Sequence, residues 1–365
     1  MKKILVKAPA LSRSGYGEQT RFALRALRSV EDKLDIYIIN IPWGGTGFIN
    51  YYDEERAWID QLILKTGQYV QAGGQFDISL QVTIPNEFAQ LAPINVGYTA
   101  GIETTKIAPQ WIEKGNTMNK ILVVSNHSKS VYENTAYEAT NNQTGEVISN
   151  YKVTTPVEAI NYCVRGVAPP TELDIQLDYD FNFLAMAQAG PRKNLPNTIK
   201  WFVEEFIDQE VGLVVKTSVT SDSLADRVAT EARMKALLDA YPDRKCKVYL
   251  LHGTLEEAQL SALYQNKKIK AMVSLTHGEG FGLPLFEAVC NGMPVICPLW
   301  SGQSDFLYAP VKDKKSKKPR RALDVNEILL LTLGFIGKKL DDKGKIVNKK
   351  KKSKGGKVLP DGTYF

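Results

Sequence analysis

The chain has few of the residues that build metal centres, disulfide frameworks or histidine-based catalysis. Its 365 residues include three histidines and four cysteines, and the cysteines, at positions 163, 246, 290 and 297, show no metal-ligand spacing. Free thiols in a reducing compartment fit this pattern best, and no metal site is expected. The low histidine count also disfavours chemistry that depends on several histidines.

Long apolar segments are missing too. The longest apolar run, residues 328–336, is too short to cross a bilayer. Charge returns at Lys7, too soon after Met1 for a signal peptide. We therefore expect a cytoplasmic protein without a transmembrane segment. Hydrophobic content of 44% and charged content of 24% are ordinary for a globular chain, and the length suffices for two domains.

Charge is spread unevenly along the chain. Residues 311–365 hold 17 Lys and Arg against 6 Asp and Glu, whereas residues 1–310 hold 29 against 34. A mildly acidic body therefore precedes a strongly basic tail. Such a tail suits a polyanion, either nucleic acid or an anionic membrane surface. A solvated, disordered end is the other reading of a Lys-rich stretch without aromatic residues.

Segments of strand character alternate with segments of helical character. Strands are expected at residues 3–8, 34–41, 76–82, 94–99 and 121–125 and, beyond a Pro-containing linker at 167–170, at 181–187, 211–217, 247–251, 271–275 and 294–298. The alternation predicts an α/β protein with doubly wound parallel sheets. We expect a first domain at 1–170, a second at 171–310 and a basic Lys-rich tail at 311–365.

The most informative stretch runs from Ser274 to Ala288. A short apolar strand leads into a turn with three glycines, and Pro284 can occupy the first turn of the helix that follows. The backbone amides at this helix start have no partner within the helix, so they form a site for an anion such as phosphate. The amides in question belong to Phe281, Gly282 and Leu283, and Gly280 in the same turn is a further donor-binding candidate.

Two carboxylates, Glu279 and Glu287, flank this anion site at a spacing of eight residues. Carboxylates beside a phosphate site are useful when they accept hydrogen bonds from neutral hydroxyls, and sugars supply such hydroxyls. The pair therefore indicates a ligand with phosphate and sugar together, a nucleotide sugar. The alternative is an ordinary strand–turn–helix unit with acidic residues near the helix start.

The segment from Glu279 to Glu287 resembles the Glu-x7-Glu signature of the retaining GT-B glycosyltransferases of the group one family, and Gly292–Ile296 and Ser301–Asp305 also fit it. The resemblance implies two Rossmann-like domains facing each other across a cleft. It further implies a UDP- or GDP-sugar, such as UDP-glucose, as donor substrate, with no prosthetic group and no required metal. Glu287 would hold the donor's ribose and Glu279 would touch the transferred sugar.

Other donor-binding residues follow from the same resemblance. Lys193 matches the family's diphosphate-binding Lys, but the Arg expected five residues earlier is Gln188, and Arg192 could substitute for it. Further donor candidates are Lys216 at a strand end, His252 and Gly253 near the base through their backbone, and Gly15 and Gly17, which resemble a glycine loop near the phosphates. Lys216 could instead be an ordinary surface lysine, and Gly15 and Gly17 could belong to a plain tight turn.

Three polar residues follow predicted strands on the acceptor side: Glu103, Ser125 and His127. Family members often have a His after the fourth strand, where this chain has Glu103. We expect Glu103 to position the acceptor hydroxyl or to act as its base. The alternative for Glu103 is an acid that caps a helix or forms a salt bridge. The alternative for His127 is a capping or packed histidine. The predicted catalytic set is therefore Glu279, Glu103 and Lys193.

The acceptor is least determined. The Ser14–Gly17 opening and the Thr276–Pro284 core are similar to bacteriophage members that glycosylate hydroxymethylated pyrimidines in DNA, and the basic tail favours that acceptor, in the host cytoplasm. A cell-envelope polysaccharide or lipid-linked saccharide is the alternative acceptor. A nucleotide-sugar epimerase and a non-catalytic nucleotide-sugar-binding protein remain as rivals, the latter because of Gln188.

Overall fold

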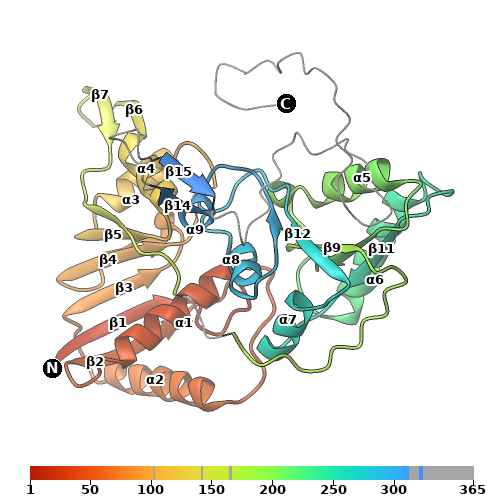
Figure 1. The fold of residues 1–365 in the computed structure, drawn as a ribbon. Helices are drawn as coiled ribbons and strands as arrows, with labels where there is room; N and C mark the ends of the chain where they lie inside the picture. Colours follow the sequence, from red (N-terminus) through yellow and green to blue (C-terminus); the bar gives the residue numbers. More distant parts are fainter. Residues whose placement is uncertain (102, 141–142, 164–166, 312–319, 324–365) are drawn as a thin grey trace.

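The computed structural model describes residues 1–311 and 320–323, apart from residues 102, 141–142 and 164–166. Within these ranges the chain forms two parallel sheets with helices packed against them, side by side in Figure 1. The predicted α/β class and doubly wound sheets are confirmed. The predicted basic tail lies outside the described residues, except for Val311 and residues 320–323.

The first sheet has six parallel strands in the order β2-β1-β3-β4-β5-β8. The strands are β1 (Lys2–Ala8), β2 (Leu34–Asn40), β3 (Ile78–Val82), β4 (Ile94–Thr99), β5 (Lys120–Val123) and β8 (Val157–Ala159). Strand order reverses between β1 and β3. Loops at the carboxyl ends of these two strands and their neighbours therefore border the position where such sheets bind ligands.

Three of the four helices described in the first domain begin at a side-chain cap. The four helices are α1 (Gly15–Arg28), α2 (Glu54–Gln71), α3 (Pro109–Gly115) and α4 (Asn126–Asn134), with a short 3-10 turn at Pro85–Glu87. Ser14, Asp53 and Ser125 cap α1, α2 and α4 through their side chains. The polar stretch after Asn134 forms an antiparallel hairpin, β6 (Ala136–Thr140) and β7 (Val147–Lys152), which projects from the domain (Figure 1).

The second sheet has five parallel strands in the order β11-β10-β9-β12-β13. They are β9 (Asn182–Met186), β10 (Gly212–Lys216), β11 (Lys247–Leu251), β12 (Ile269–Val273) and β13 (Val295–Ile296). The order reverses between β9 and β12, so the loops after these two strands border this sheet's ligand position. These loops contain Lys193 and Glu279.

Helices α5 (Leu195–Phe206), α6 (Leu224–Leu238), α7 (Glu257–Tyr264), α8 (Leu283–Cys290) and α9 (Ser304–Leu307) belong to the second half, together with a 3-10 turn at Pro191–Lys193. A two-stranded pair, β14 (Tyr308–Val311) and β15 (Arg320–Leu323), follows α9. No helix among the described residues is both long and apolar enough to cross a membrane.

The two halves share part of their hydrophobic core. Phe281 and Phe306 from the second half pack into the cluster built on β1 and α1, where the Phe281 ring lies 5.0 Å from that of Tyr162. The Asp305 carboxylate also reaches the first domain and accepts hydrogen bonds from the backbone and side chain of Asn126 and from Asn161. Leu177 packs in the second core. The boundary after residue 170 stays a prediction, compatible with this division.

Candidate functional site

The turn between β12 and α8 contains three glycines because it lies against backbone of the first domain. A Cβ atom on Gly278 would come 2.2 Å from the carbonyl oxygen of Glu103, and one on Gly280 would come 2.0 Å from that of Ala100. Gly282 has a positive φ of 92°, which favours glycine. The glycines thus allow the turn to touch the loop after β4.

Helix α8 begins at Leu283, with Gly282 at its N-cap and Pro284 in its first turn. The expected helix start is therefore present. Within the described part of the chain, the amides of Phe281, Gly282 and Leu283 donate to no other residue. Their partial positive charge makes this helix start suitable for an anion.

A cluster of two acids and two bases lies beside this helix start. Lys193 Nζ is 2.6 and 2.8 Å from the two carboxylate oxygens of Glu279. Arg192 contacts Glu279 at 3.2 Å and Glu103 of the first domain at 3.2 Å. The structure therefore brings Lys193, Arg192, Glu279 and Glu103 together, although they come from three separate segments of the chain.

Backbone contacts between the β9 and β12 loops fix this arrangement. The carbonyl of Arg192 accepts hydrogen bonds from His277 N at 2.9 Å and from Thr276 Oγ1 at 3.2 Å. Asn194, in the left-handed region with φ of 54°, donates from Nδ2 to the Leu275 carbonyl at 3.0 Å. The two loops therefore hold Lys193 next to Glu279.

Burial changes the ionisation of this cluster. Desolvation raises the pKa of Glu103, and the nearby Arg192 opposes that effect. Desolvation also lowers the pKa of Lys193, against the attraction of the Glu279 carboxylate. Both pKa shifts lower the free-energy cost of the neutral forms, which are protonated Glu103 and deprotonated Lys193. An anion that entered the cluster would favour the charged form of Lys193.

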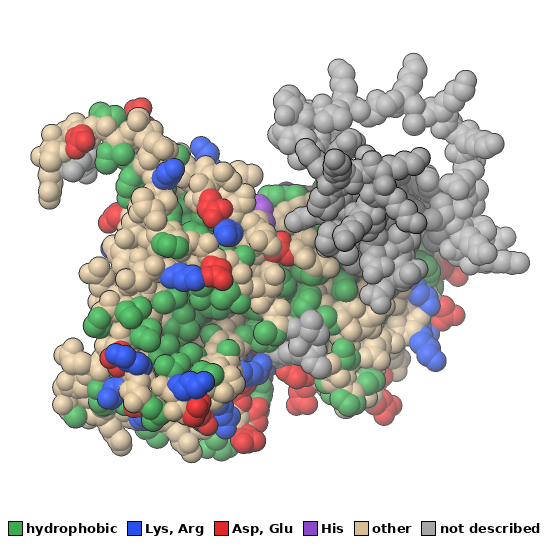
Figure 2. Space-filling model, turned by 60° about the vertical axis from the view of Figure 1, so that its left-hand side comes forward, with side chains coloured by type: hydrophobic (Ala, Val, Ile, Leu, Met, Phe, Trp, Pro, Cys, Tyr) green, Lys and Arg blue, Asp and Glu red, His purple; other side chains and the backbone are tan. Residues whose placement is uncertain are grey.

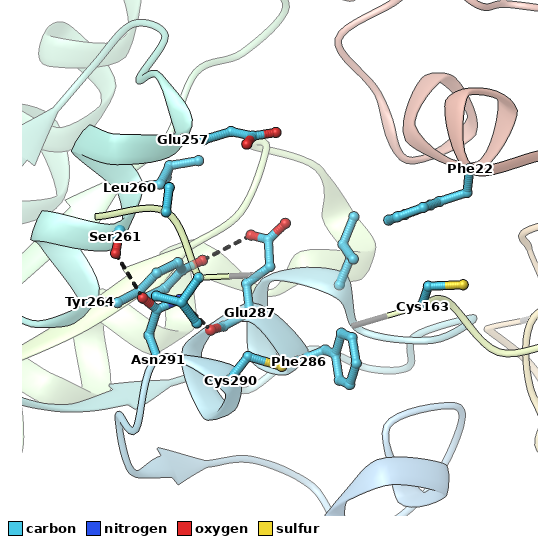
Figure 3. A pocket seen from close by; sticks show the side chains of 13 residues that line it. Phe22, Cys163, Glu257, Leu260, Ser261, Tyr264, Phe286, Glu287, Cys290 and Asn291 are labelled. Atoms are coloured by element: carbon cyan, nitrogen blue, oxygen red, sulfur yellow. Dashed lines mark hydrogen bonds between the residues drawn. The ribbon is translucent and has the colours of Figure 1, made fainter. Parts of the chain in front are cut away.

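Glu287 faces a different space, a small cavity of about 70 Å³ between α7, α8, α1 and the segment near Cys163. Its carboxylate points toward Tyr264, whose hydroxyl lies 3.2 Å from Glu287 Oε2 (Figure 3). Leu283 also lines the cavity, so the cavity reaches the start of α8. Glu279 and Lys193 do not line it.

Tyr16 is a site residue that the sequence analysis missed. Its hydroxyl hydrogen-bonds Thr99 Oγ1 at 2.7 Å, and a Cβ on Gly101 would lie 3.5 Å from that hydroxyl and 3.7 Å from a Glu103 carboxylate oxygen. Burial raises the pKa of Tyr16, and the negative charge of Glu103 adds to the increase. Tyr16 lies between the two glycines of the Ser14–Gly17 motif, which was the available signal.

The glycines of that motif differ in their surroundings. A Cβ on Gly17 would come 1.9 Å from the Ser12 carbonyl oxygen, whereas one on Gly15 would meet nothing within 4 Å. The amide of Gly17 already donates to the capping Ser14 Oγ at 3.0 Å. Close packing thus accounts for Gly17, and a phosphate contact for either glycine stays a prediction.

Gln188 occupies the position where the family has a diphosphate-binding Arg, and its side chain hydrogen-bonds to backbone carbonyls. Its Nε2 donates to the Val219 carbonyl at 3.0 Å and to the Gly45 carbonyl of the first domain at 3.3 Å. Lys216 donates to the Gly253 carbonyl, and burial lowers its pKa. Neither side chain lies in the Lys193 cluster as described, so their donor roles stay predictions.

The His252 side chain is almost completely buried, and its Nε2 lies 2.8 Å from Asp226 Oδ1. Burial raises the pKa of Asp226, but hydrogen bonds from His252 and from the amides of residues 219–221 outweigh it and hold that pKa well below its usual range. The His252 side chain therefore supports the loop after β10, and a donor contact through the backbone of His252 or Gly253 stays a prediction.

The remaining acceptor-side candidates, Ser125 and His127, make contacts that stabilise the fold. Ser125 is fully buried and its Oγ accepts from Ser128 N at 3.1 Å. The His127 ring packs edge-on against Trp300 at 5.5 Å, and burial lowers its pKa. Capping and packing thus account for both residues, and contact with an acceptor stays a prediction for each.

Among the described residues, no group of three or more His, Cys, Asp or Glu side chains is arranged to hold a metal ion. An Asp-x-Asp sequence exists at Asp178–Asp180, before β9. Its two carboxylates pair with lysines, Asp178 with Lys247 at 3.0 Å and Asp180 with Lys268 at 3.3 Å. All four cysteines are free thiols.

Comparison with known proteins adds a family match in the second half. Residues 231–307 match the family model "Glycosyl transferases group 1". The matched segment runs from within α6 to the end of α9, so it contains Glu279 and Glu287. A search of curated protein sequences gives no significant match.

Several solved structures share the fold over most of the chain. Sucrose-phosphate synthase (tll1590) from Thermosynechococcus elongatus has a TM-score of 0.52 at 14% identity, covering 83% of this chain and 82% of that one. Alr3699/HepE from Anabaena, solved with UDP-glucose, has a TM-score of 0.51 at 13% identity, with 83% and 82% covered. A glycosyltransferase from Rickettsia africae ESF-5 has a TM-score of 0.50 at 13% identity, with 82% and 80% covered. At these identities the likeness shows the fold, so the expected GT-B architecture is confirmed.

Proposed function

We propose that this chain, a nucleotide-sugar-dependent glycosyltransferase with the GT-B fold, transfers its sugar to an acceptor hydroxyl with retention of anomeric configuration. The observation that carries the proposal is the Lys193–Glu279 pair beside the start of α8, within reach of Glu103 through Arg192. Cationic groups and free amides for a diphosphate thus lie next to acids suited to sugar hydroxyls.

In this proposal the second domain holds the donor. Lys193, Arg192 and the amides of residues 281–283 stabilise the diphosphate, whose negative charge grows as the bond to the sugar breaks. Glu287 accepts hydrogen bonds from the ribose hydroxyls. Glu279 accepts them from the transferred sugar. The present ion pairs of Lys193 and Arg192 would be exchanged in part for contacts with the phosphates.

Donor binding requires the site to widen. Ligand pockets commonly have volumes of about 300–1,000 Å³, whereas the cavity at Glu287 has about 70 Å³. The glycine turn also lies in contact with Ala100 and Glu103 of the first domain. We therefore infer that the two domains move apart to admit the donor and return to this arrangement around it.

The chemical step breaks the bond between the anomeric carbon and the diphosphate oxygen. The acceptor oxygen forms the new bond to that carbon and loses its proton. Glu103 lies on the first domain opposite Glu279 and is our candidate to position this hydroxyl or to receive its proton. Lys193 stabilises the negative charge of the leaving diphosphate. Retention of configuration is inferred from the family resemblance of residues 279–287.

The DNA acceptor expected from the sequence rests on the resemblance to bacteriophage members and on the basic tail, most of which lies outside the described residues. On the face shown in Figure 2, Lys and Arg side chains alternate with Asp and Glu instead of forming one basic patch. Residues 1–310 carry five more acids than bases. A hydroxymethylated pyrimidine in DNA therefore stays a prediction, with a saccharide as the other acceptor.

Incubation with labelled UDP- and GDP-sugars tests the proposal. We expect one donor to release its nucleoside diphosphate and to transfer label to an acceptor among oligosaccharides, lipid-linked saccharides, and DNA with or without hydroxymethylated pyrimidines. Conversion of the donor into another nucleotide sugar would instead identify an epimerase. Binding of a donor without any turnover would identify a non-catalytic binding protein.

A further inference from the structure

The loop between β2 and α2, residues 42–52, carries an unusual group of aromatic residues. We call it the aromatic loop. It contains Trp43, Phe48, Tyr51 and Tyr52, and it follows the carboxyl end of β2. The carboxyl ends of β1 and β4 lie on the same edge of the parallel sheet, so the aromatic loop borders the start of α1, which contains Tyr16, and the loop that contains Glu103.

Hydrogen bonds to the β1–α1 loop give the aromatic loop a defined shape. Arg13 N donates to the Gly47 carbonyl at 2.8 Å, and Ile49 N donates to the Leu11 carbonyl at 2.9 Å. The hydroxyls of Ser12 and Thr46 lie 2.9 Å apart. The loop is therefore organised before any ligand binds, which lowers the entropy cost of binding.

The aromatic loop also reaches the site described above. The Trp43 and Tyr16 rings have centroids 4.3 Å apart, and Tyr16 lies beside Glu103. On the opposite side the Gly45 carbonyl accepts from Gln188 of the second domain, and a Cβ on Gly45 would lie 3.2 Å from the Thr220 side chain. The loop thus stands next to the reacting groups, where the two domains meet.

Three of its rings are exposed to solvent. The exposed fractions are 54% for Phe48, 50% for Tyr51 and 76% for Tyr52. Arg13 lies over the Tyr51 ring and Arg56 over the Phe48 ring, at 5.5 and 5.4 Å. An exposed aromatic group of this kind, in a loop whose Trp43 ring packs on Tyr16, is suited to a ligand with a flat apolar face.

The charge around the aromatic loop indicates what the ligand is. Residues 42–60 contain the acids Asp53, Glu54, Glu55 and Asp60 and the single base Arg56. Arg56 Nε is 3.0 Å from both carboxylate oxygens of Asp60, so its charge is already compensated. Arg25 pairs with Glu55 and Arg28 with Glu54, so acids and bases around the loop are balanced and no excess of positive charge favours a polyanion. A neutral sugar ring fits this balanced charge, and its hydroxyls can hydrogen-bond to the acids.

We propose that the aromatic loop binds the acceptor, and that the acceptor is a neutral saccharide whose apolar ring faces stack on Tyr51 and Tyr52. The assignment rests on the proposed function, because it places the acceptor of that same transfer. It extends the function by naming the acceptor class and the residues that select it. Glu103 and Tyr16 then lie where the reacting hydroxyl of the bound saccharide enters the site.

A glycan array of neutral and acidic oligosaccharides, probed with the full chain in the presence of UDP, tests this proposal. We expect binding to neutral glycans, about tenfold weaker in Tyr51→Ala and Tyr52→Ala because each loses one stacking ring. Trp201→Ala removes a ring that is 44% exposed on α5, away from the loop, and should bind like the wild type. The best glycan then serves as acceptor, and the two tyrosine variants should raise its KM more than they lower kcat.

Contrary results are distinct. Binding that Tyr51→Ala and Tyr52→Ala leave unchanged, binding to acidic glycans alone, or transfer to hydroxymethylated DNA in place of any saccharide would overturn the proposal. A blank array with active release of nucleoside diphosphate by the wild type would also overturn it, while the glycosyltransferase function stood. Absence of turnover with every donor would count against the function itself, and the array would still report on the loop.

Discussion

Replacement of Lys193 by methionine separates its part in donor binding from its part in stability. Methionine keeps the length of the side chain and removes its charge. In the structure Lys193 Nζ lies 2.6 and 2.8 Å from the oxygens of Glu279, and the side chains of the pair are 19% and 11% exposed. The substitution therefore leaves a largely buried carboxylate with one base fewer.

Breaking a buried ion pair costs about 3–5 kcal/mol. Arg192 remains 3.2 Å from Glu279 Oε2 and compensates part of the charge, so we expect a smaller loss of stability, about 2–3 kcal/mol. In the donor complex the lost contact is a charge-assisted hydrogen bond to phosphate, worth about 1.5–3 kcal/mol. That loss corresponds to a roughly 10- to 150-fold increase in the Kd for the nucleoside diphosphate.

Calorimetric titration with UDP and GDP, together with denaturant unfolding, measures both effects. Lys200→Met is the matched control, because Lys200 is 52% exposed on α5 and lies 3.8 Å from Glu204. The double variant Lys193→Met with Glu279→Gln removes the carboxylate that has lost one of its two bases, so it should regain stability without regaining affinity for the diphosphate. Wild-type affinity in Lys193→Met would refute the phosphate-binding role of this residue.

Three further perturbations test other parts of the account. Gly280→Ala places a Cβ 2.0 Å from the Ala100 carbonyl oxygen and should reduce kcat/KM by at least tenfold, whereas Gly15→Ala, with nothing within 4 Å, should lower neither kcat/KM nor Tm by a comparable amount. Because burial raises the pKa of Glu103, kcat/KM should fall as pH drops through that raised pKa, above the usual glutamate range; a pH–rate profile in which Glu103→Gln keeps the same acid limb would contradict its role. Asp305→Ala removes three hydrogen bonds between the domains and should lower the free energy of unfolding by about 2 kcal/mol, measured by denaturant titration; an unchanged value would show that Asp305 does not hold the domains together.

The sequence was most informative where the structural signal is local. The glycines, Pro284 and the preceding apolar strand lie within a few residues of each other, so the β12–turn–α8 unit could be predicted with its free amides. The alternation of strands and helices was equally local. Lys193 and Glu279, by contrast, are 86 residues apart, and only their matched positions in a family motif indicated that both serve the donor.

Helices with weak amphipathic patterns were missed. Helix α6 buries Asp226, Thr230 and Met234, while Leu224 and Val228 are exposed, so its sequence lacks a continuous apolar stripe. Helix α4 begins directly after β5, and Ser125, expected on the acceptor side at the end of a strand, caps this helix. A serine between a strand and a helix suits either role, so the local sequence does not decide between them.

Contacts between the domains could not be derived from the sequence at all. Phe281 was expected to matter through its amide alone, yet its ring packs in the first domain's core beside Tyr162. The Arg192–Glu103 contact likewise depends on how the two sheets are placed. Gln188 was noted as a departure from the family, and its hydrogen bonds to Gly45 and Val219 explain how an uncharged residue is used there.

A crystal structure of the chain soaked with its nucleoside diphosphate would test the central claim most directly. We expect the phosphates to lie against the amides of residues 281–283 and Lys193, with the ribose hydroxyls hydrogen-bonded to Glu287. A nucleotide bound elsewhere, with the Lys193–Glu279 pair and the start of α8 untouched, would contradict it.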